Sequence, residues 1–158
     1  MMYRALWVSF LFCAVVLYFL AANEEIKRTP DSLFYIEAAE YHTAGEMMRN
    51  YDHNGRYGEI YYKSGDYFVQ WAPGYPLVLA QFFRAGIGWE AAARVINAVA
   101  AGLIVLGLLY GLRRYAGWVQ ASAVLAFVGY PGIRMVNEYA MTEMLFMAVV
   151  TWAVVLDW

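Results

Sequence analysis

The chain has 158 residues, of which 63% are hydrophobic and only 15% are charged, and its formal net charge is -2. Ordinary soluble domains carry roughly 45–50% apolar and about 25% charged residues, so this composition predicts a protein that is covered by lipid. The absence of a long basic run excludes a nucleic-acid partner. Cys13 is the only cysteine, which excludes an internal disulfide and a multi-cysteine metal site.

Four apolar runs have the length and composition of candidate membrane spans. A run of roughly 20 apolar residues crosses the hydrocarbon layer, because an α-helix rises about 1.5 Å per residue. The runs cover residues 5–22, 91–112, 117–131 and 139–157, so we expect a single all-α membrane domain with about four transmembrane helices. The third run is short for a span and is closed by Pro131, where a helix would end.

The basic residues predict the orientation of these spans. Arg4 and Arg113-Arg114 fall on one side of the membrane, and the excess of arginine and lysine in short loops marks that side as cytoplasmic. We therefore expect a cytoplasmic N-terminus, an external loop over residues 23–90, and a place in a bacterial or archaeal plasma membrane. Arg134 falls on the external side. The first run has a rival interpretation as a cleaved secretory leader.

The last apolar run reaches Trp158, where the sequence stops without a polar tail. This ending predicts a truncated reading frame. A complete four-helix protein with tightly packed ends is the alternative.

The external loop contains two predicted interfacial helices, near residues 32–46 and 76–84. Thr29-Pro30-Asp31-Ser32 is a capping signal for the first of them. That helix is expected to lie flat at the interface on an apolar face, which is made of Leu33, Phe34, Ala38, Tyr41 and Ala44. Between the two helices, residues 60–62 and 67–69 are a possible β-hairpin.

The second span carries polar and small residues that are unusual in a lipid-facing helix. Arg94 and Asn97 lie in its first two turns. The small residues Ala98, Ala101, Gly102 and Gly107 favour a close approach of neighbouring helices.

Four stretches, in this order along the chain, carry a resemblance to a known family. They are Asp31-Ser32-Leu33-Phe34-Tyr35, Trp71-Ala72-Pro73-Gly74-Tyr75-Pro76-Leu77, Ala93-Arg94-Val95-Ile96-Asn97 and Thr142-Glu143-Met144-Leu145-Phe146. With them the chain resembles the N-terminal part of the GT-C superfamily of membrane glycosyltransferases, near the protein O-mannosyltransferases of glycosyltransferase family 39 and the lipid A aminoarabinose transferases. Many of these relatives carry a pair of acidic residues where this chain has Asp31-Ser32.

The resemblance implies a helical-bundle fold, a polyprenyl-phosphate-linked sugar donor, a lipid, glycan or protein acceptor, an active site outside the cytoplasm, and inversion at the anomeric carbon. Such a transfer needs a base to accept the proton of the acceptor hydroxyl, and Asp31 is the catalytic candidate. The alternative role of Asp31 is to cap the helix that follows it.

The leaving phosphate needs positive charge, and Arg94 is the candidate for supplying it. A salt bridge to Glu90, four residues earlier, is the equally plausible structural role of Arg94. Arg84 and Arg134 are weaker candidates. Glu143 is expected to line the site, and Tyr35 and Tyr75 are expected to bind the donor with it.

No cofactor is predicted. The segment Asp52-His53-Asn54-Gly55 contains ligand-type atoms, but the Asn-Gly pair favours a turn over a metal site. A non-enzymatic transporter or membrane assembly subunit is the alternative function, and a tethered external enzyme behind a cleaved leader is a third.

Overall fold

The computed structural model describes residues 2–22, 25–47, 73–140 and 142–157. Within these ranges every regular element is an α-helix, which confirms the all-α prediction for this part of the chain. The helices are α1 (Met2–Ala22), α2 (Pro30–Thr43), α3 (Gly74–Arg84), α4 (Trp89–Gly111), α5 (Gly117–Gly129), α6 (Pro131–Asn137) and α7 (Glu143–Asp157). The predicted hairpin at residues 60–69 lies outside the described residues.

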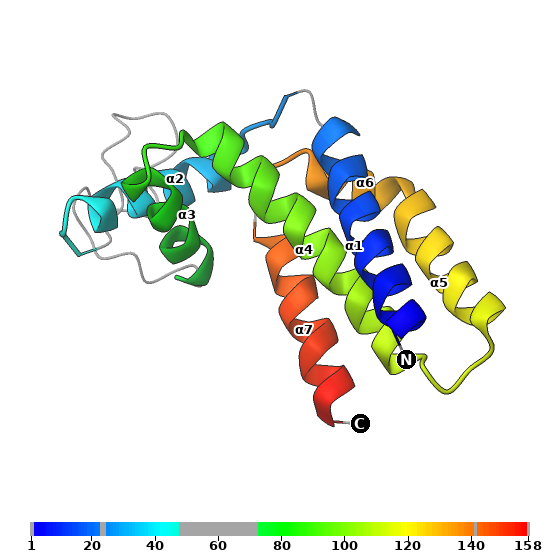
Figure 1. The fold of residues 1–158 in the computed structure, drawn as a ribbon. Helices are drawn as coiled ribbons and strands as arrows, with labels where there is room; N and C mark the ends of the chain where they lie inside the picture. Colours follow the sequence, from blue (N-terminus) through cyan, green and yellow to red (C-terminus); the bar gives the residue numbers. More distant parts are fainter. Residues whose placement is uncertain (1, 23–24, 48–72, 141, 158) are drawn as a thin grey trace.

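Helix α4 is the centre of the bundle, with α1 on one side and α7 on the other (Figure 1). Helices α2 and α3 lie beside its Trp89 end, whereas α1 begins and α7 ends at its Gly111 end. Among the described residues α4 is the one single helix that is long and apolar enough to cross a membrane. The bent pair α5–α6 passes the same test as a unit, and the apolar part of α1, Leu6–Ala22, is shorter.

Small residues let the neighbours of α4 approach its backbone closely. Gly102 and Gly107 are both buried. A Cβ atom added at Gly102 would lie 2.6 Å from the Phe12 ring and 2.8 Å from a Val16 methyl group on α1, and one added at Gly107 would lie 2.6 Å from a Thr151 methyl group on α7. Ala98 and Ala101 are also buried. The predicted small-residue contact is therefore confirmed.

The third apolar run is broken where the sequence predicts it. Tyr130 has an extended backbone, as expected for a residue that precedes proline, and Pro131 is the first residue of α6. The helical path continues beyond the proline as α6, which is bent by 55° from α5.

The buried face of α2 agrees with the predicted one only in part. Ala38 is buried and Phe34 packs against the same cluster, as expected. Tyr35, Ile36 and Ala39 are also buried against α3 and α4, whereas Ala44, which was expected on the apolar face, is exposed. The prediction treated α2 as a lone helix on a flat surface. Its orientation is instead set by packing against α3, which comes from a distant part of the chain.

We expect Gly102→Leu to lower the free energy of unfolding by about 1–3 kcal/mol, because the added side chain must displace Phe12 and Val16. Gly129→Leu is the matched control, since a Cβ at Gly129 meets nothing within 4 Å. Thermal denaturation in detergent, followed by circular dichroism, measures both. Equal stability of the two variants would contradict close packing at Gly102.

Candidate functional site

Asp31 lies in the first turn of α2 but does not cap the helix. The cap is Thr29, whose Oγ1 accepts a hydrogen bond of 3.1 Å from the Ser32 backbone N–H. The Ser32 Oγ accepts one of 3.1 Å from the Thr29 backbone N–H in return. The interpretation of Asp31 as the cap is therefore wrong, because Thr29 and Ser32 already satisfy these groups. Asp31 is half-buried near the positive end of the helix dipole.

Two tyrosines connect Asp31 with the start of α7. Tyr35 is one turn after Asp31, and its ring meets the ring of Tyr75 edge to face, with centroids 5.5 Å apart. Both rings are buried. Glu143, the first residue of α7, lies close enough to both tyrosines to act on their titration. We call Asp31, Tyr35, Tyr75 and Glu143 the outer cluster. It brings together four of the five predicted site residues.

The outer cluster keeps its tyrosines protonated. Burial raises the pKa of Tyr35, a hydrogen bond with Thr142 opposes this shift, and the charges of Glu143 and Asp31 add to it. Burial is also the main cause that raises the pKa of Tyr75, and the charges of Glu143 and Tyr35 raise it further. Both side chains therefore remain neutral hydroxyl donors at physiological pH.

The outer cluster contains buried polar atoms without a hydrogen-bond partner. The Tyr75 hydroxyl and the Glu143 Oε2 are both buried, and neither has a partner within the described residues. Leaving such atoms unpaired costs free energy, typically about 1–3 kcal/mol for each. A polar ligand that reached these atoms could accept a hydrogen bond from the Tyr75 hydroxyl and donate one to the Glu143 Oε2.

Asn97 fixes the segment that leads into Glu143. Its amide nitrogen donates to the carbonyl oxygens of Asn137 at 3.0 Å and of Tyr139 at 2.8 Å. Asn97 is fully buried in α4. The sequence predicted neither this role nor the contact of Thr142 with Tyr35. An amide inside an apolar run was the available signal for Asn97, because a buried amide needs partners.

A backbone bridge holds the same segment from the other side. Lys27 and Tyr139 form an isolated parallel bridge, with hydrogen bonds from Lys27 N–H to Glu138 O at 2.7 Å and from Ala140 N–H to Lys27 O at 3.2 Å. The Lys27 ammonium also donates to Glu138 at 2.8 Å. This hydrogen bond raises the pKa of Lys27 and lowers the pKa of Glu138. The start of α7 is thereby tied to the chain just before α2.

The arginine candidates come from three different helices. Arg94 is half-buried in α4, Arg84 is the last residue of α3, and Arg134 belongs to α6. The ion pairs among the described residues do not include the alternative one between Arg94 and Glu90. Arg84 donates to the His42 carbonyl at 3.1 Å, and Arg134 lies 3.8 Å from Glu138.

Within the described ranges, no three His, Cys, Asp or Glu side chains gather closely enough to hold a metal ion. The Asp52-His53-Asn54-Gly55 segment lies outside those ranges.

No protein-family model, curated protein or solved structure matches this chain. The resemblance to GT-C glycosyltransferases therefore stays a prediction, and the case for a function depends on the geometry of the outer cluster.

Removal of the α2 cap separates helix stability from the role of Asp31. We expect Thr29→Val combined with Ser32→Ala to destabilise the fold by about 1 kcal/mol, because two backbone N–H groups lose their partners. Asp31→Asn should change stability by less than the cap variant does. Chemical denaturation in mixed micelles compares the two, and a larger loss for Asp31→Asn would return the capping role to Asp31.

Alkaline pH should destabilise the fold through the outer cluster. Because the pKa of Tyr75 is raised in the folded protein, the unfolded chain loses this tyrosine proton at a lower pH than the folded protein does. The free energy of unfolding is therefore unaffected below the unfolded tyrosine pKa of about 10, and it falls as the pH rises from there through the folded pKa. Tyr75→Phe removes the contribution of Tyr75 to this dependence and leaves that of Tyr35. It also removes an unpaired buried hydroxyl, so it should leave neutral-pH stability unchanged or higher. Thermal melts near pH 7 and above about pH 10 test both statements. Tyr110→Phe, at an exposed ring, is the control.

Proposed function

We propose that this chain is the N-terminal membrane part of an inverting GT-C-type glycosyltransferase, which transfers a sugar from a polyprenyl phosphate to a lipid, glycan or protein acceptor outside the cytoplasm. The observation that carries the proposal is the outer cluster. In it Asp31, which does not cap α2, acts on Tyr35, and Tyr35 packs against the second protonated tyrosine, Tyr75, at one end of the helical bundle.

Exposed apolar side chains support a place in the membrane. Trp7 on α1, Trp118 on α5 and Leu156 on α7 are each about 70% exposed, at 69%, 73% and 70%. Large apolar side chains that are this exposed on three helices fit a surface that faces lipid. In the proposed arrangement α1, α4, the bent pair α5–α6 and α7 are the four spans. Helices α2 and α3 lie at the external interface.

The proposed reaction is a displacement at the anomeric carbon. The Asp31 carboxylate accepts the proton of the acceptor hydroxyl while the acceptor oxygen forms its bond to the anomeric carbon. The bond from that carbon to the phosphate oxygen breaks on the opposite face, so the configuration inverts and polyprenyl phosphate leaves with the bonding electrons. Asp31 then releases its proton to water.

The other predicted residues serve the donor. The hydroxyls of Tyr35 and Tyr75 are donors for phosphate or sugar oxygens, and a preorganised donor acts most strongly where charge develops. Glu143 accepts a hydrogen bond from a sugar hydroxyl through its unpaired Oε2. Arg94 supplies positive charge from the first turns of α4. The leaving group gains charge rather than a proton, so a general acid is not required.

Replacing Asp31 tests this function. We expect Asp31→Asn in the full-length protein to lower sugar transfer from mixed polyprenyl-phosphate sugars in proteoliposomes by at least about 100-fold, because the amide cannot accept the proton. Glu40→Gln, an exposed carboxylate on the same helix, is the matched control and should retain activity.

Undiminished transfer by Asp31→Asn would overturn the catalytic role. The transporter or assembly-subunit alternative predicts that neither the unchanged protein nor the control variant transfers sugar at all.

A further inference from the structure

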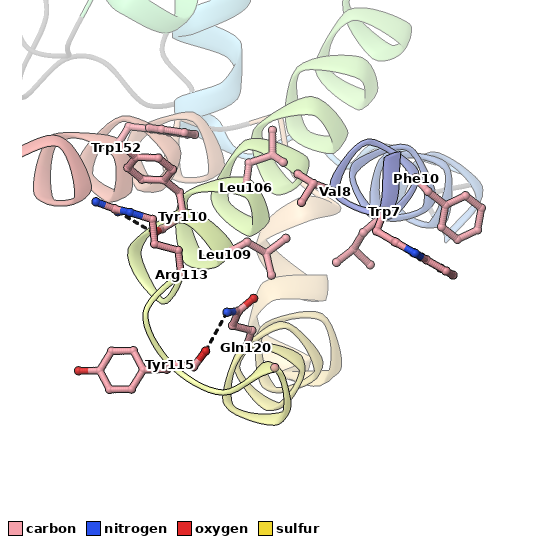
Figure 2. Close-up of a pocket in the computed structure, with 12 residues that line it drawn as sticks. Trp7, Val8, Phe10, Leu106, Leu109, Tyr110, Arg113, Tyr115, Gln120 and Trp152 are labelled. Carbon is pink, nitrogen blue, oxygen red and sulfur yellow. Dashed lines mark hydrogen bonds between the residues drawn. The ribbon is translucent and has the colours of Figure 1, made fainter. Parts of the chain in front are cut away.

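A pocket of about 720 Å³ lies at the Gly111 end of the bundle, at the opposite end of α4 from the outer cluster (Figure 2). It is formed by α1, α4, the start of α5 and the end of α7. Its lining includes Val8 of α1, Leu106, Leu109 and Tyr110 of α4, Arg113 of the loop between α4 and α5, and Trp152 of α7. Its volume lies in the range of roughly 300–1,000 Å³ that is typical of ligand pockets.

The pocket has an apolar interior and a single charged side chain. Val8 of α1 faces Leu106 and Leu109 of α4 across it (Figure 2). Arg113 is the one charged residue of its lining, and Arg114, also exposed, follows it in the chain. Among the described residues no acidic side chain lines the pocket, so Arg113 favours an anionic group at the pocket itself.

Two contacts with Tyr110 fix the position of Arg113 and leave several of its N–H donors available. One guanidinium nitrogen donates to the Tyr110 carbonyl at 2.9 Å, and the guanidinium lies 4.0 Å from the centre of the Tyr110 ring. An arginine has five N–H donors, so these contacts leave most of them available at the exposed edge. The geometry is that of an anchored cation at the mouth of an apolar groove.

We propose that this pocket binds an anionic phospholipid of the cytoplasmic leaflet, with an acyl chain between α1 and α4 and the phosphate at Arg113 and Arg114. Basic pockets between membrane helices on the cytoplasmic side are known to hold anionic headgroups. The inference depends on the membrane arrangement in the proposed function, but it does not depend on glycosyl transfer.

The position of the pocket separates this lipid from the sugar donor. Helix α4 has 23 residues, and at about 1.5 Å per residue its two ends are on the order of 30 Å apart. The polyprenyl phosphate is recognised at the Trp89 end. A phospholipid at the Gly111 end therefore belongs to the other leaflet.

Tryptophan quenching by brominated lipids tests the proposal. Trp152 lines the pocket and its indole is fixed by a hydrogen bond of 3.0 Å to the Leu103 carbonyl, so a variant that retains Trp152 as its only tryptophan reports on the site. The protein is reconstituted in phosphatidylcholine vesicles that contain a minority of brominated phosphatidylglycerol or of brominated phosphatidylcholine. We expect brominated phosphatidylglycerol to quench preferentially.

Three variants locate the lipid. Arg113→Gln should weaken the preference for phosphatidylglycerol about fivefold. Arg134→Gln makes the same charge change at the other end of the bundle and should leave it unchanged. Leu106→Trp narrows the apolar part of the pocket, where its own indole reports on the same site, and should reduce the preference without removing either arginine.

Each contrary result has a separate meaning. Equal quenching of the unchanged protein by the two lipids, or a preference that Arg113→Gln leaves unchanged, would overturn recognition of the anionic headgroup. A preference that Leu106→Trp leaves unchanged would place the lipid at the rim and overturn binding in the pocket. Release of the protein from vesicles by alkaline carbonate would instead defeat the membrane arrangement, and with it both proposals. Loss of sugar transfer alone leaves the lipid result standing.

Discussion

The arrangement of the bundle depends on the close approach of α1 and α7 to the backbone of α4. Gly102 and Gly107 provide it on two sides of the same helix, because Phe12 and Val16 of α1 and Thr151 of α7 occupy the space that a Cβ atom would fill. In lipid the apolar surroundings give helices little reason to associate, so tight packing between small residues carries much of the association.

The outer cluster follows from that packing. Once α7 is placed against α4, Asn97 holds the carbonyls of Asn137 and Tyr139, and this positions Glu143 at the start of α7. The Thr29 and Ser32 cap starts α2, and Tyr35 then meets Tyr75 of α3. Residues from three separate helices therefore reach one place. The two ends of α4 consequently carry different chemistry: tyrosines and carboxylates at one end, and an apolar pocket with arginine at the other.

Several features of the fold could be predicted because they are local. The break at Pro131 follows from the missing N–H and the restricted residue before it. The close contact at Gly102 and Gly107 follows from a stripe of small residues in an apolar run. The full buried face of α2 could not be predicted in the same way, because the sequence of α2 does not show that it packs against α3. The capping signal at Thr29-Pro30-Asp31-Ser32 was confirmed, and only the alternative role of Asp31 as the cap was wrong. Thr29 and Asp31 are both good capping residues, and only the backbone geometry decides between them.

Composition and apolar periodicity by themselves determined that this chain is helical and rich in apolar runs, because those properties depend on each segment alone. The resemblance to GT-C glycosyltransferases, and not composition, singled out Asp31, Tyr35 and Tyr75, whereas Glu143 was also marked by its place in an apolar run. Only the tertiary structure decided that these four lie together. It also decided that Asn97 ties α4 to the start of α7. Contacts between residues that are 40 or more positions apart depend on how the helices pack, and no local pattern in the chain encodes that packing.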